Sequence, residues 1–588
     1  MASDQPKDEH LSSDDRTTEA HPTPAELPAW YRWSAIVLAS LLTFLLLLLT
    51  FVVWAFRGGD NNHVALWIFG AEVLLLGVFL AFGRKTFWKW AAVKYRWLTT
   101  RTGQAVAVAA TLLIALLIAP GLQGPGKPVA DASGHRVAVI GGGSAGVHSA
   151  WMLHQAGIDF DLYEATDAIG GHAYSPTFTP DEGTPFDCDI GFIFGSPVDY
   201  QEMKVLMDWH GVERTQAELG VSSLVDGAAW ACGPDVSSEA KRFMRLADEE
   251  HNDASLNMVP FGFWLTLNGF SEQFRREYIA PLLSIIFITD VGQYEISARF
   301  VLNLAAGRLQ WIDFERGSPA WTVKGGTRTY YERLSKEYKD HIRLQTPVTK
   351  VTRKGDKVIV EAFGPGGKQI EEVYDDVIFA VPADVAHALL QDKDWLEDFL
   401  LSEVRYEDGE LVLHTDDTLL PKEELRRQYN YFQDNKAHPG EFELSGIMNW
   451  VHSAGYMSPL PVGTLNPLRP IDPEKVIVRR GWRHHAMDLW HLALMLEGLP
   501  SIQGRGGVWY AGDWVTVIGH GPAMRTGMAA ACNVGAKSRI KKAPEGARCI
   551  DVRVEEDRAG KPAVDVHLCG EEELFAYFVE RQCNGFKI

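Results

Sequence analysis

The stretch RVAVIGGGSAGVHSAWMLHQAGIDFDLYEATDAIGGH, from Arg136 to His172, decides the fold. Its first five residues, 136–140, form a β-branched run typical of a buried parallel strand. A glycine-rich turn follows directly, residues 144–157 predict a helix that ends at Gly157, and residues 159–163 predict a second strand. The order strand, glycine-rich turn, helix and strand predicts a Rossmann-like α/β unit.

The glycines of this turn have the spacing of a dinucleotide-binding motif. Gly141 allows the tight turn, Gly143 lets the backbone approach a pyrophosphate, and Gly146 lets the helix pack closely on the strand. The pyrophosphate is expected at the start of the helix, beside Ser144 and Ala145. Unpaired backbone N–H groups and the helix dipole favour an anion there.

An acidic residue and a second glycine pair follow the helix. Glu164 lies 18 residues after Gly146, near the spacing of about 20 residues at which a carboxylate accepts hydrogen bonds from a ribose. A carboxylate in this place disfavours NADP. The pair Gly170-Gly171, just past the acid, resembles FAD proteins related to the flavin-containing amine oxidases, which implies FAD as the cofactor. In this resemblance His172 replaces the arginine that commonly follows the pair, and we expect it to contact an FAD phosphate.

Later blocks resemble the same superfamily and imply further cofactor contacts. WTVKGGTRTY at 321–330 resembles the motif that returns from the substrate domain, and VTKV at 348–351 resembles the strand that meets the adenine, beginning at Val348. AGDW at 511–514 and MRTGMAAA at 524–531 resemble the C-terminal flavin-contacting motif, which implies contacts by Gly512, Asp513 and Met524. The resemblance also implies that the last helix points its N-terminus at the flavin ring.

A narrower resemblance runs from about residue 135 to 540. Its blocks are similar to predicted NAD/FAD-binding flavoproteins that are often associated with cyclopropane-fatty-acid synthases: DIGFIF (189–194), LHTD (413–416), IMNW (447–450), TLNP (464–467) and YAGDW (510–514).

The expected architecture is a Rossmann-like FAD-binding domain of the amine-oxidase type with an interleaved α+β substrate domain, preceded by transmembrane helices. The FAD-binding domain is expected at 135–200, 320–385 and 505–540, and the substrate domain at 201–319 and 386–504. Residues 541–588 predict a small β-rich appendage without an assigned function.

Two side chains are candidates for chemistry beside the flavin. His520 could act as an acid or base because imidazole titrates near neutral pH, and a purely structural role is equally open. Lys324, in the block at 321–330, is a candidate for orienting water near the flavin N5. Amine oxidases usually hold the amine between aromatic rings, but residues 515–522 carry no ring except His520, which disfavours an amine substrate.

The N-terminal region predicts membrane attachment. Residues 1–29 are acidic and polar and predict a disordered tail. Three hydrophobic segments follow, of which 34–56 carries no charge, 64–82 carries one acid, Glu72, and 104–120 is short enough to lie on the surface instead of spanning. At 1.5 Å per residue, about 20 residues cross the hydrocarbon core. A multi-pass membrane protein with about three spans is therefore expected.

The flanks of the third segment support a position at the bilayer. Residues 84–103 combine basic and aromatic side chains without an acid, which is typical of a membrane interface. Residues 121–134 form a Gly/Pro-rich linker that keeps the enzyme body close to the bilayer. The sequence leaves open which side of the membrane this body faces.

Composition excludes other classes of function. The net charge of −20 disfavours nucleic-acid binding, which requires basic patches. The six cysteines show neither a CxxC pair nor zinc spacing, so we expect no metal site and reduced thiols, with a disulfide near the C-terminus still open.

These patterns together predict a membrane-anchored FAD-dependent oxidoreductase. We expect hydride transfer to flavin N5 from a hydrophobic or lipid substrate, an unsaturated fatty acyl chain or an isoprenoid, with net dehydrogenation or isomerisation. Two alternatives stay open: a flavin-dependent amine oxidase, and a flavoprotein-like accessory subunit that binds membrane protein partners.

Overall fold

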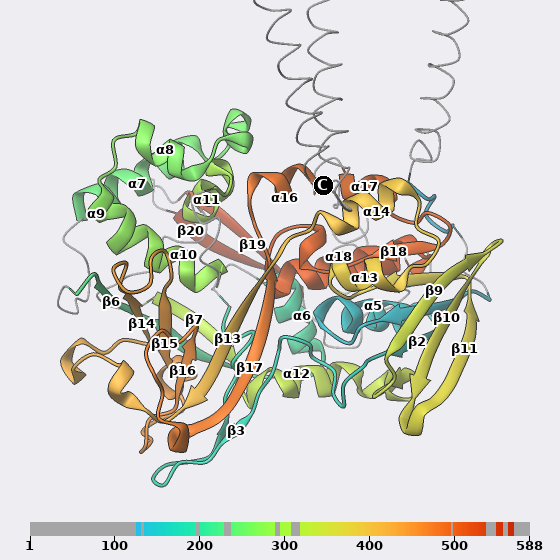
Figure 1. Ribbon diagram of the computed structural model, residues 1–588, viewed down its shortest axis with the longest axis horizontal. Helices are drawn as coiled ribbons and strands as arrows, with labels where there is room; N and C mark the ends of the chain where they lie inside the picture. The colour runs from blue at the N-terminus through green and yellow to red at the C-terminus, as the bar shows by residue number, and fades with distance from the viewer. Residues whose placement is uncertain are drawn as a thin grey trace, which may run out of the picture. The chain divides into compact units, whose positions relative to one another are not determined.

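The computed structural model describes residues 125–130, 134–195, 200–227, 237–287, 295–306, 318–494, 498–536, 549–556 and 562–569 (Figure 1). All of them belong to one unit of the chain, Leu116–Ile588. The acidic tail, the three hydrophobic segments and the basic aromatic loop lie outside the described residues. Within the described ranges, no helix has the length and apolar character needed to cross a bilayer.

A five-stranded parallel sheet forms the centre of the cofactor domain. Its order is β18-β12-β1-β2-β8, and each neighbouring pair is parallel. The strands are β1 (Arg136–Ile140), β2 (Asp159–Tyr163), β8 (Ile342–Arg343), β12 (Asp376–Phe379) and β18 (Val508–Tyr510). The predicted Rossmann-like unit is confirmed, and the sheet is completed by segments far apart in the sequence.

Two helices pack closely beside this sheet. Helix α5 (Ser144–Gln155) follows the glycine-rich turn, and helix α18 (His520–Asn533) lies against it (Figure 1). A Cβ on Gly527 would lie 2.0 Å from the carbonyl oxygen of Ala145, so only glycine permits this approach. The Ser149 hydroxyl donates to the Gly527 carbonyl at 2.9 Å and fixes the pair of helices further.

A second, antiparallel sheet is built from β9 (Val348–Lys354), β10 (Lys357–Gly364) and β11 (Lys368–Tyr374). The sequence predicts a strand that begins at Val348, which is β9, whereas the run KQIEEVY of β11 is mostly polar and gives no strand signal. Arg136 joins β11 to the parallel sheet through hydrogen bonds to Glu372 at 2.8 Å and Asp161 at 2.5 Å.

A third sheet is mixed and six-stranded, with the order β17-β13-β16-β15-β14-β6. Its strands are β6 (Val221–Val225), β13 (Tyr406–His414), β14 (Tyr429–Gln433), β15 (Glu443–Ile447), β16 (Val462–Leu465) and β17 (Val476–His485). Helices gather at one end of this sheet in Figure 1: α7 (Ser237–Glu250), α8 (Phe261–Leu267), α9 (Glu272–Phe274), α10 (Ala280–Phe287) and α11 (Ala298–Leu304). Their buried aromatic side chains and one face of the sheet share a single apolar core.

The remaining elements connect these layers. The strands are β3 (Thr177–Phe178), β4 (Phe186–Asp187), β5 (Arg214–Leu219), β7 (Ser318–Val323), β19 (Cys549–Glu556) and β20 (Pro562–Cys569). The helices are α6 (Gln201–Trp209), α12 (Gly326–Ser335), α13 (Ala383–Leu389), α14 (Trp395–Ser402), α15 (Met448–Val451), α16 (Leu489–Ala493) and α17 (Leu499–Ile502). Cys188 is a free buried thiol, whereas Cys532 is disulfide-bonded, so the expectation of reduced thiols fails at Cys532.

Candidate active site

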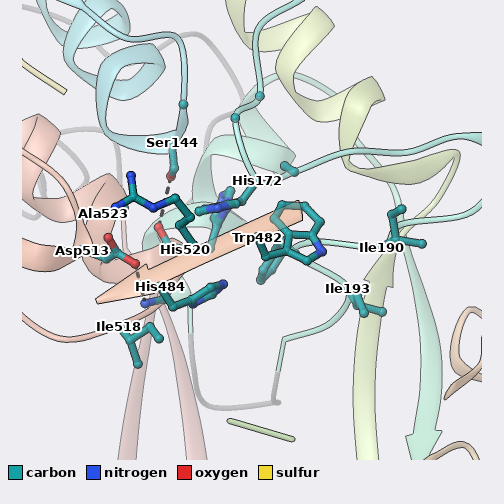
Figure 2. A pocket seen from close by; sticks show the side chains of 18 of the residues that line it. Ser144, His172, Ile190, Ile193, Trp482, His484, Asp513, Ile518, His520 and Ala523 are labelled. Carbon is teal, nitrogen blue, oxygen red and sulfur yellow. Dashed lines mark hydrogen bonds between the residues drawn. The ribbon is translucent and has the colours of Figure 1, made fainter. Parts of the chain in front are cut away.

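A cavity of about 640 Å³ lies where the parallel sheet meets the six-stranded sheet (Figure 2). Residues directly after β1, β2, β12 and β18 line one end of it, among them Gly141, Glu164, Ala380 and Gly512. Parallel sheets bind ligands at the carboxyl ends of their strands. This end is therefore the expected place for a dinucleotide, and it is called the cofactor end below.

The glycine-rich turn has the geometry that its spacing predicts. Gly141 has φ of +106°, and a Cβ there would lie 2.4 Å from the Ala380 carbonyl oxygen. A Cβ on Gly146 would lie 1.8 Å from the Gly141 carbonyl oxygen, which confirms that this glycine allows close packing of helix on strand. Gly146 itself is absent from the residues that line the cavity, whereas Gly143, Ser144 and Ala145 line it.

Glu164 organises this turn. One carboxylate oxygen, Oε2, accepts a hydrogen bond from the backbone N–H of Gly142 at 2.7 Å. The other, Oε1, accepts from the backbone N–H and the hydroxyl of Thr166, each at 2.8 Å. A carboxylate has about four lone-pair sites, so capacity remains for one hydrogen bond from a ribose.

Two helix N-termini open on the cofactor end. Helix α5 starts after Gly143 and helix α18 starts after Gly519, and among the described residues neither start has a side-chain cap or an acid in its first turn. Their free N–H groups therefore need another partner, and an anion satisfies them best. A Cβ on Gly171 would lie 2.9 Å from the Gly143 Cα, so the glycine pair leaves the space beside α5 free of side chains. These features fit the pyrophosphate of FAD.

A group of imidazoles lines the same end. The His172 and His484 rings stack with centroids 5.1 Å apart, and Trp482 lies 4.8 Å from His172 (Figure 2). Burial, with a smaller effect of His484, lowers the pKa of His172 to about 4. Asp513 also lines the cavity, and its carboxylate lies 3.8 Å from Nδ1 of the fully buried His485. These rings are therefore uncharged near neutral pH.

His520 lies at the start of α18 and lines the cavity (Figure 2). Its ring stacks on Phe192 at 4.3 Å, its Nε2 lies 3.2 Å from the Tyr331 hydroxyl, and its carbonyl accepts from the Ser144 hydroxyl at 3.1 Å. Burial, and then the nearby His148 and His172, lower the pKa of His520 to about 3. The neutral ring can accept or donate a hydrogen bond, but at neutral pH it has no imidazolium proton to give as a general acid.

Besides Gly146, three predicted site residues do not line the cavity. Lys324 lies on the surface, where its ammonium group pairs with Glu213 at 2.5 Å because β5 and β7 bring the two residues together. Val348 starts β9 and packs, half-buried, against the core beside the sheet. Met524 is fully buried on the inner face of α18. The ammonium group of Lys324 therefore lies outside the cavity.

The other end of the cavity is formed by residues that the sequence does not predict as site residues. We call this set the apolar end: Ile285, Leu304, Leu411, Tyr429, Leu444, Met448 and Leu465. Alternating apolar residues on strands indicate a buried face, but the pattern cannot tell a cavity wall from a filled core. Trp482 and Phe194 also line the cavity, so aromatic rings that residues 515–522 lack come from other elements.

The site thus combines a cradle for a dinucleotide with an adjoining apolar cavity. Residues 144–406 match the family model described as flavin containing amine oxidoreductase, so this part of the chain is similar to that family. FAD is the family's cofactor, as the glycine pair at 170–171 predicts. The match ends at Tyr406, the first residue of β13, and so leaves most of the six-stranded sheet outside it.

Curated relatives are distant. Amine oxidase [flavin-containing] B of Cavia porcellus is 21% identical over 278 residues, which is 42% of this chain and 50% of the relative. FAD-dependent oxidoreductase pigF of Monascus ruber is 22% identical over 237 residues, 38% of this chain and 50% of the relative. The chain thus spans about half the length of the curated relatives that it matches.

Solved structures share the fold over a larger part. The CLA-producing fatty acid isomerase from P. acnes is 20% identical with a TM-score of 0.50, and the match covers 68% of this chain and 98% of that one. Putrescine oxidase bound to putrescine is 14% identical, with the same TM-score and the same coverage of both chains. At these sequence identities the two matches show a common fold and do not identify the substrate of this protein.

Proposed function

We propose that this protein is a membrane-anchored, FAD-dependent oxidoreductase that breaks a C–H bond of an unsaturated fatty acyl or isoprenoid substrate, with net dehydrogenation or isomerisation. The observation that carries the proposal is the apolar end of the cavity. The hydrophobic segments at 34–56, 64–82 and 104–120 support anchoring, because a substrate dissolved in lipid is met most often at the membrane.

The chemistry of the cavity wall favours such a substrate. The carboxylates among the described lining residues, Glu164 and Asp513, both lie at the cofactor end. An ammonium group that entered the apolar end would lose its hydration without gaining a carboxylate there, which is unfavourable. An acyl chain gains about 25 cal/mol for each Å² of apolar surface that it buries.

The residues of this chain contribute positioning and proton handling. When bound, FAD supplies an acceptor for two electrons and one hydrogen from the C–H bond. The glycine-rich turn and the start of α5 hold its pyrophosphate, while the apolar end holds the chain and excludes water. Dehydrogenation removes a hydride and a proton and leaves a double bond, whereas isomerisation returns both. The proton can be held by a neutral imidazole such as His172 or His520.

The lowered pKa values suit the isomerisation variant. His172 has a pKa of about 4 and His520 of about 3, so a proton taken by either ring is given back readily. Burial raises the pKa of Tyr429, at the apolar end, well above its usual value, so its hydroxyl keeps its proton as a hydrogen-bond donor. A solved structure of the same fold is that of a CLA-producing fatty acid isomerase, which supports this variant.

A flavin-dependent amine oxidase is the second candidate. The observation that favours it is the set of rings that line the cavity, Phe194, Tyr429 and Trp482, since aromatic faces attract cations. The putrescine oxidase of the same fold shows that this architecture also accommodates an amine. The two candidates differ in what reduces the flavin.

The deciding measurement is the visible spectrum of the purified full chain in detergent, recorded without oxygen. Addition of unsaturated free fatty acids or polyprenyl lipids is expected to bleach the flavin or shift its bands, and a panel of monoamines and polyamines is expected to leave it unchanged. Bleaching by an amine alone would overturn the lipid assignment.

Two variants of one residue test whether the apolar end of the cavity binds the lipid substrate. Leu304 is a half-buried member of it on α11. Leu304→Gln replaces apolar surface by an amide of similar size and should raise the lipid KM about tenfold, the equivalent of one or two buried CH₂ groups at ~0.8 kcal/mol each. Leu304→Met keeps an apolar side chain and should stay within about twofold of the wild type.

A further inference from the structure

The arginines of strand β17 differ in how their charges are balanced. Arg479 pairs with Glu410 at 2.8 Å, and Arg483 pairs with Asp384 at 2.9 Å and with Asp408 at 3.2 Å. Arg480 lies between them in sequence, yet none of the ion pairs among the described residues includes it. Its positive charge is thus not matched by a carboxylate in the described protein.

Arg480 is nevertheless held in a defined position. Its guanidinium donates a hydrogen bond to the Gly171 carbonyl at 2.9 Å. It also lies over two aromatic rings, 4.3 Å from the centre of Tyr174 and 5.0 Å from that of Trp482. Cation–π contacts and one hydrogen bond fix a guanidinium without neutralising it. Burial lowers the pKa of Arg480, whereas carboxylates raise the pKa of Arg483.

The position of Arg480 directs it to the cavity. Side chains alternate along a strand, so residues 480, 482 and 484 share one face of β17. Trp482 and His484 of that face point into the cavity in Figure 2, and Arg480 is among the lining residues. The hydrogen bond to Gly171 places the guanidinium beside the glycine pair, which in turn faces Gly143 at the start of α5.

The charges of the cavity call for such a cation. Glu164 and Asp513 already line it, and a dinucleotide or a fatty acid adds further negative charge. Arg483 also lines the cavity, but its two carboxylate partners compensate it. Guanidinium groups bind carboxylates and phosphates through paired N–H donors, and such charged hydrogen bonds are stronger than neutral ones.

We propose that Arg480 binds an oxyanion of the molecule that occupies this cavity, either a phosphate of the dinucleotide cofactor or the carboxylate of an acyl substrate. The first source makes Arg480 the cation that replaces the arginine missing at His172. The second source rests on the proposed function and makes the free acid, and not its ester, the preferred substrate.

The test compares Arg480→Met and Arg480→Lys with the control Arg479→Met in the full chain. Arg479 is the neighbouring residue of the same strand, and its loss removes only the exposed pair with Glu410. Circular dichroism establishes that each variant is folded. Dissociation constants are measured by flavin fluorescence for FAD and for riboflavin, which lacks phosphate. Binding of a C18 free fatty acid and of its methyl ester is followed by the shift of the flavin bands.

If the phosphate is the partner, Arg480→Met should raise the dissociation constant for FAD at least tenfold and leave that for riboflavin unchanged. If the carboxylate is the partner, FAD binding should be unchanged, and the free acid, but not the ester, should bind at least tenfold more weakly. Arg480→Lys should recover part of either loss. A change of less than twofold for both FAD and the free acid would overturn the proposal.

The cofactor measurements and the fatty-acid measurements also test the role of Arg480 separately from the proposed function. The measurements with FAD and riboflavin need no substrate and stand even if an amine proves to reduce the flavin. A wild-type protein that binds no fatty acid would refute the proposed function and leave the FAD comparison to decide the role of Arg480.

Discussion

Replacing Glu164 by glutamine should loosen the glycine-rich turn and weaken FAD binding. The carboxylate accepts three hydrogen bonds, from the Gly142 N–H and from both donors of Thr166, at 2.7 to 2.8 Å. Glutamine has the same shape but only one acceptor oxygen. If that oxygen stays with Thr166, the amide NH₂ faces the Gly142 N–H, and two donors oppose each other.

The magnitude follows from these contacts. One charge-assisted hydrogen bond contributes about 1.5–3 kcal/mol, and the loss of charge weakens those that remain. Because the same turn receives the pyrophosphate, most of this energy should appear in cofactor affinity. We expect the dissociation constant of FAD to rise about 10- to 100-fold, which corresponds to ~1.4–2.7 kcal/mol.

The assay is the titration of cofactor-free protein with FAD, followed by quenching of flavin fluorescence, with a urea melt of the same samples. Glu361→Gln is the control, since it removes a surface ion pair with Lys350 on β9, and such pairs contribute ~0–1 kcal/mol. An FAD affinity within twofold of the wild type, in a variant whose urea midpoint has dropped, would show that Glu164 supports the fold without shaping the cofactor site.

Three further predictions concern packing and pH. Gly527→Ala places a methyl group 2.0 Å from the Ala145 carbonyl and should lower stability by about 3 kcal/mol and release FAD in a thermal melt; unchanged melting would contradict the close packing of α5 and α18. Asp189 is buried and its pKa is raised to about 7, so ionisation of its carboxyl group lowers the stability of the folded protein as the pH rises from about 4 to above 7. Asp189→Asn should therefore be more stable than the wild type by ~1–3 kcal/mol at pH 8.5 and about as stable at pH 5.5. Equal melting curves of the two proteins at both pH values would refute this. The pKa values of His148 and His520 are lowered to about 4 and 3, so the unfolded chain binds protons that the folded protein does not, and the urea midpoint should fall between pH 7 and pH 4.5; a constant midpoint would exclude buried neutral histidines.

The sequence predicts those parts of the site that are formed by residues close to one another in the chain. The strand, turn and helix of residues 136–157 are fixed by their own glycines and apolar spacing, and Glu164 contacts a residue only 22 positions away. The fold of this unit can be predicted because its contacts hardly depend on the rest of the chain.

The parts that could not be predicted depend on pairing between distant segments. Lys324 lies on the surface because it pairs there with Glu213. The two residues are 111 positions apart in the chain and meet only when β5 pairs with β7. Arg480 and Gly171 are 309 residues apart and meet only once β17 lies against the glycine pair. Hydrophobic alternation on β13, β15 and β16 predicts burial, but whether a face meets side chains or a substrate depends on helices α10 and α11 opposite it.

The order of the strands in the parallel sheet has a consequence for biosynthesis. The edge strand β18 and the helix α18 are among the last described elements to leave the ribosome, although they complete the sheet and cavity that β1 and α5 begin. At about 5–20 residues per second, the roughly 380 residues between Ile140 and His520 take about 20–75 s to synthesise. Once β12 is made, its free edge has no neighbour until β18 follows roughly 130 residues later, and the cofactor cannot find its complete site before then. FAD is therefore expected to join a finished chain, and the supply of FAD at that moment should decide how much of the nascent protein escapes aggregation.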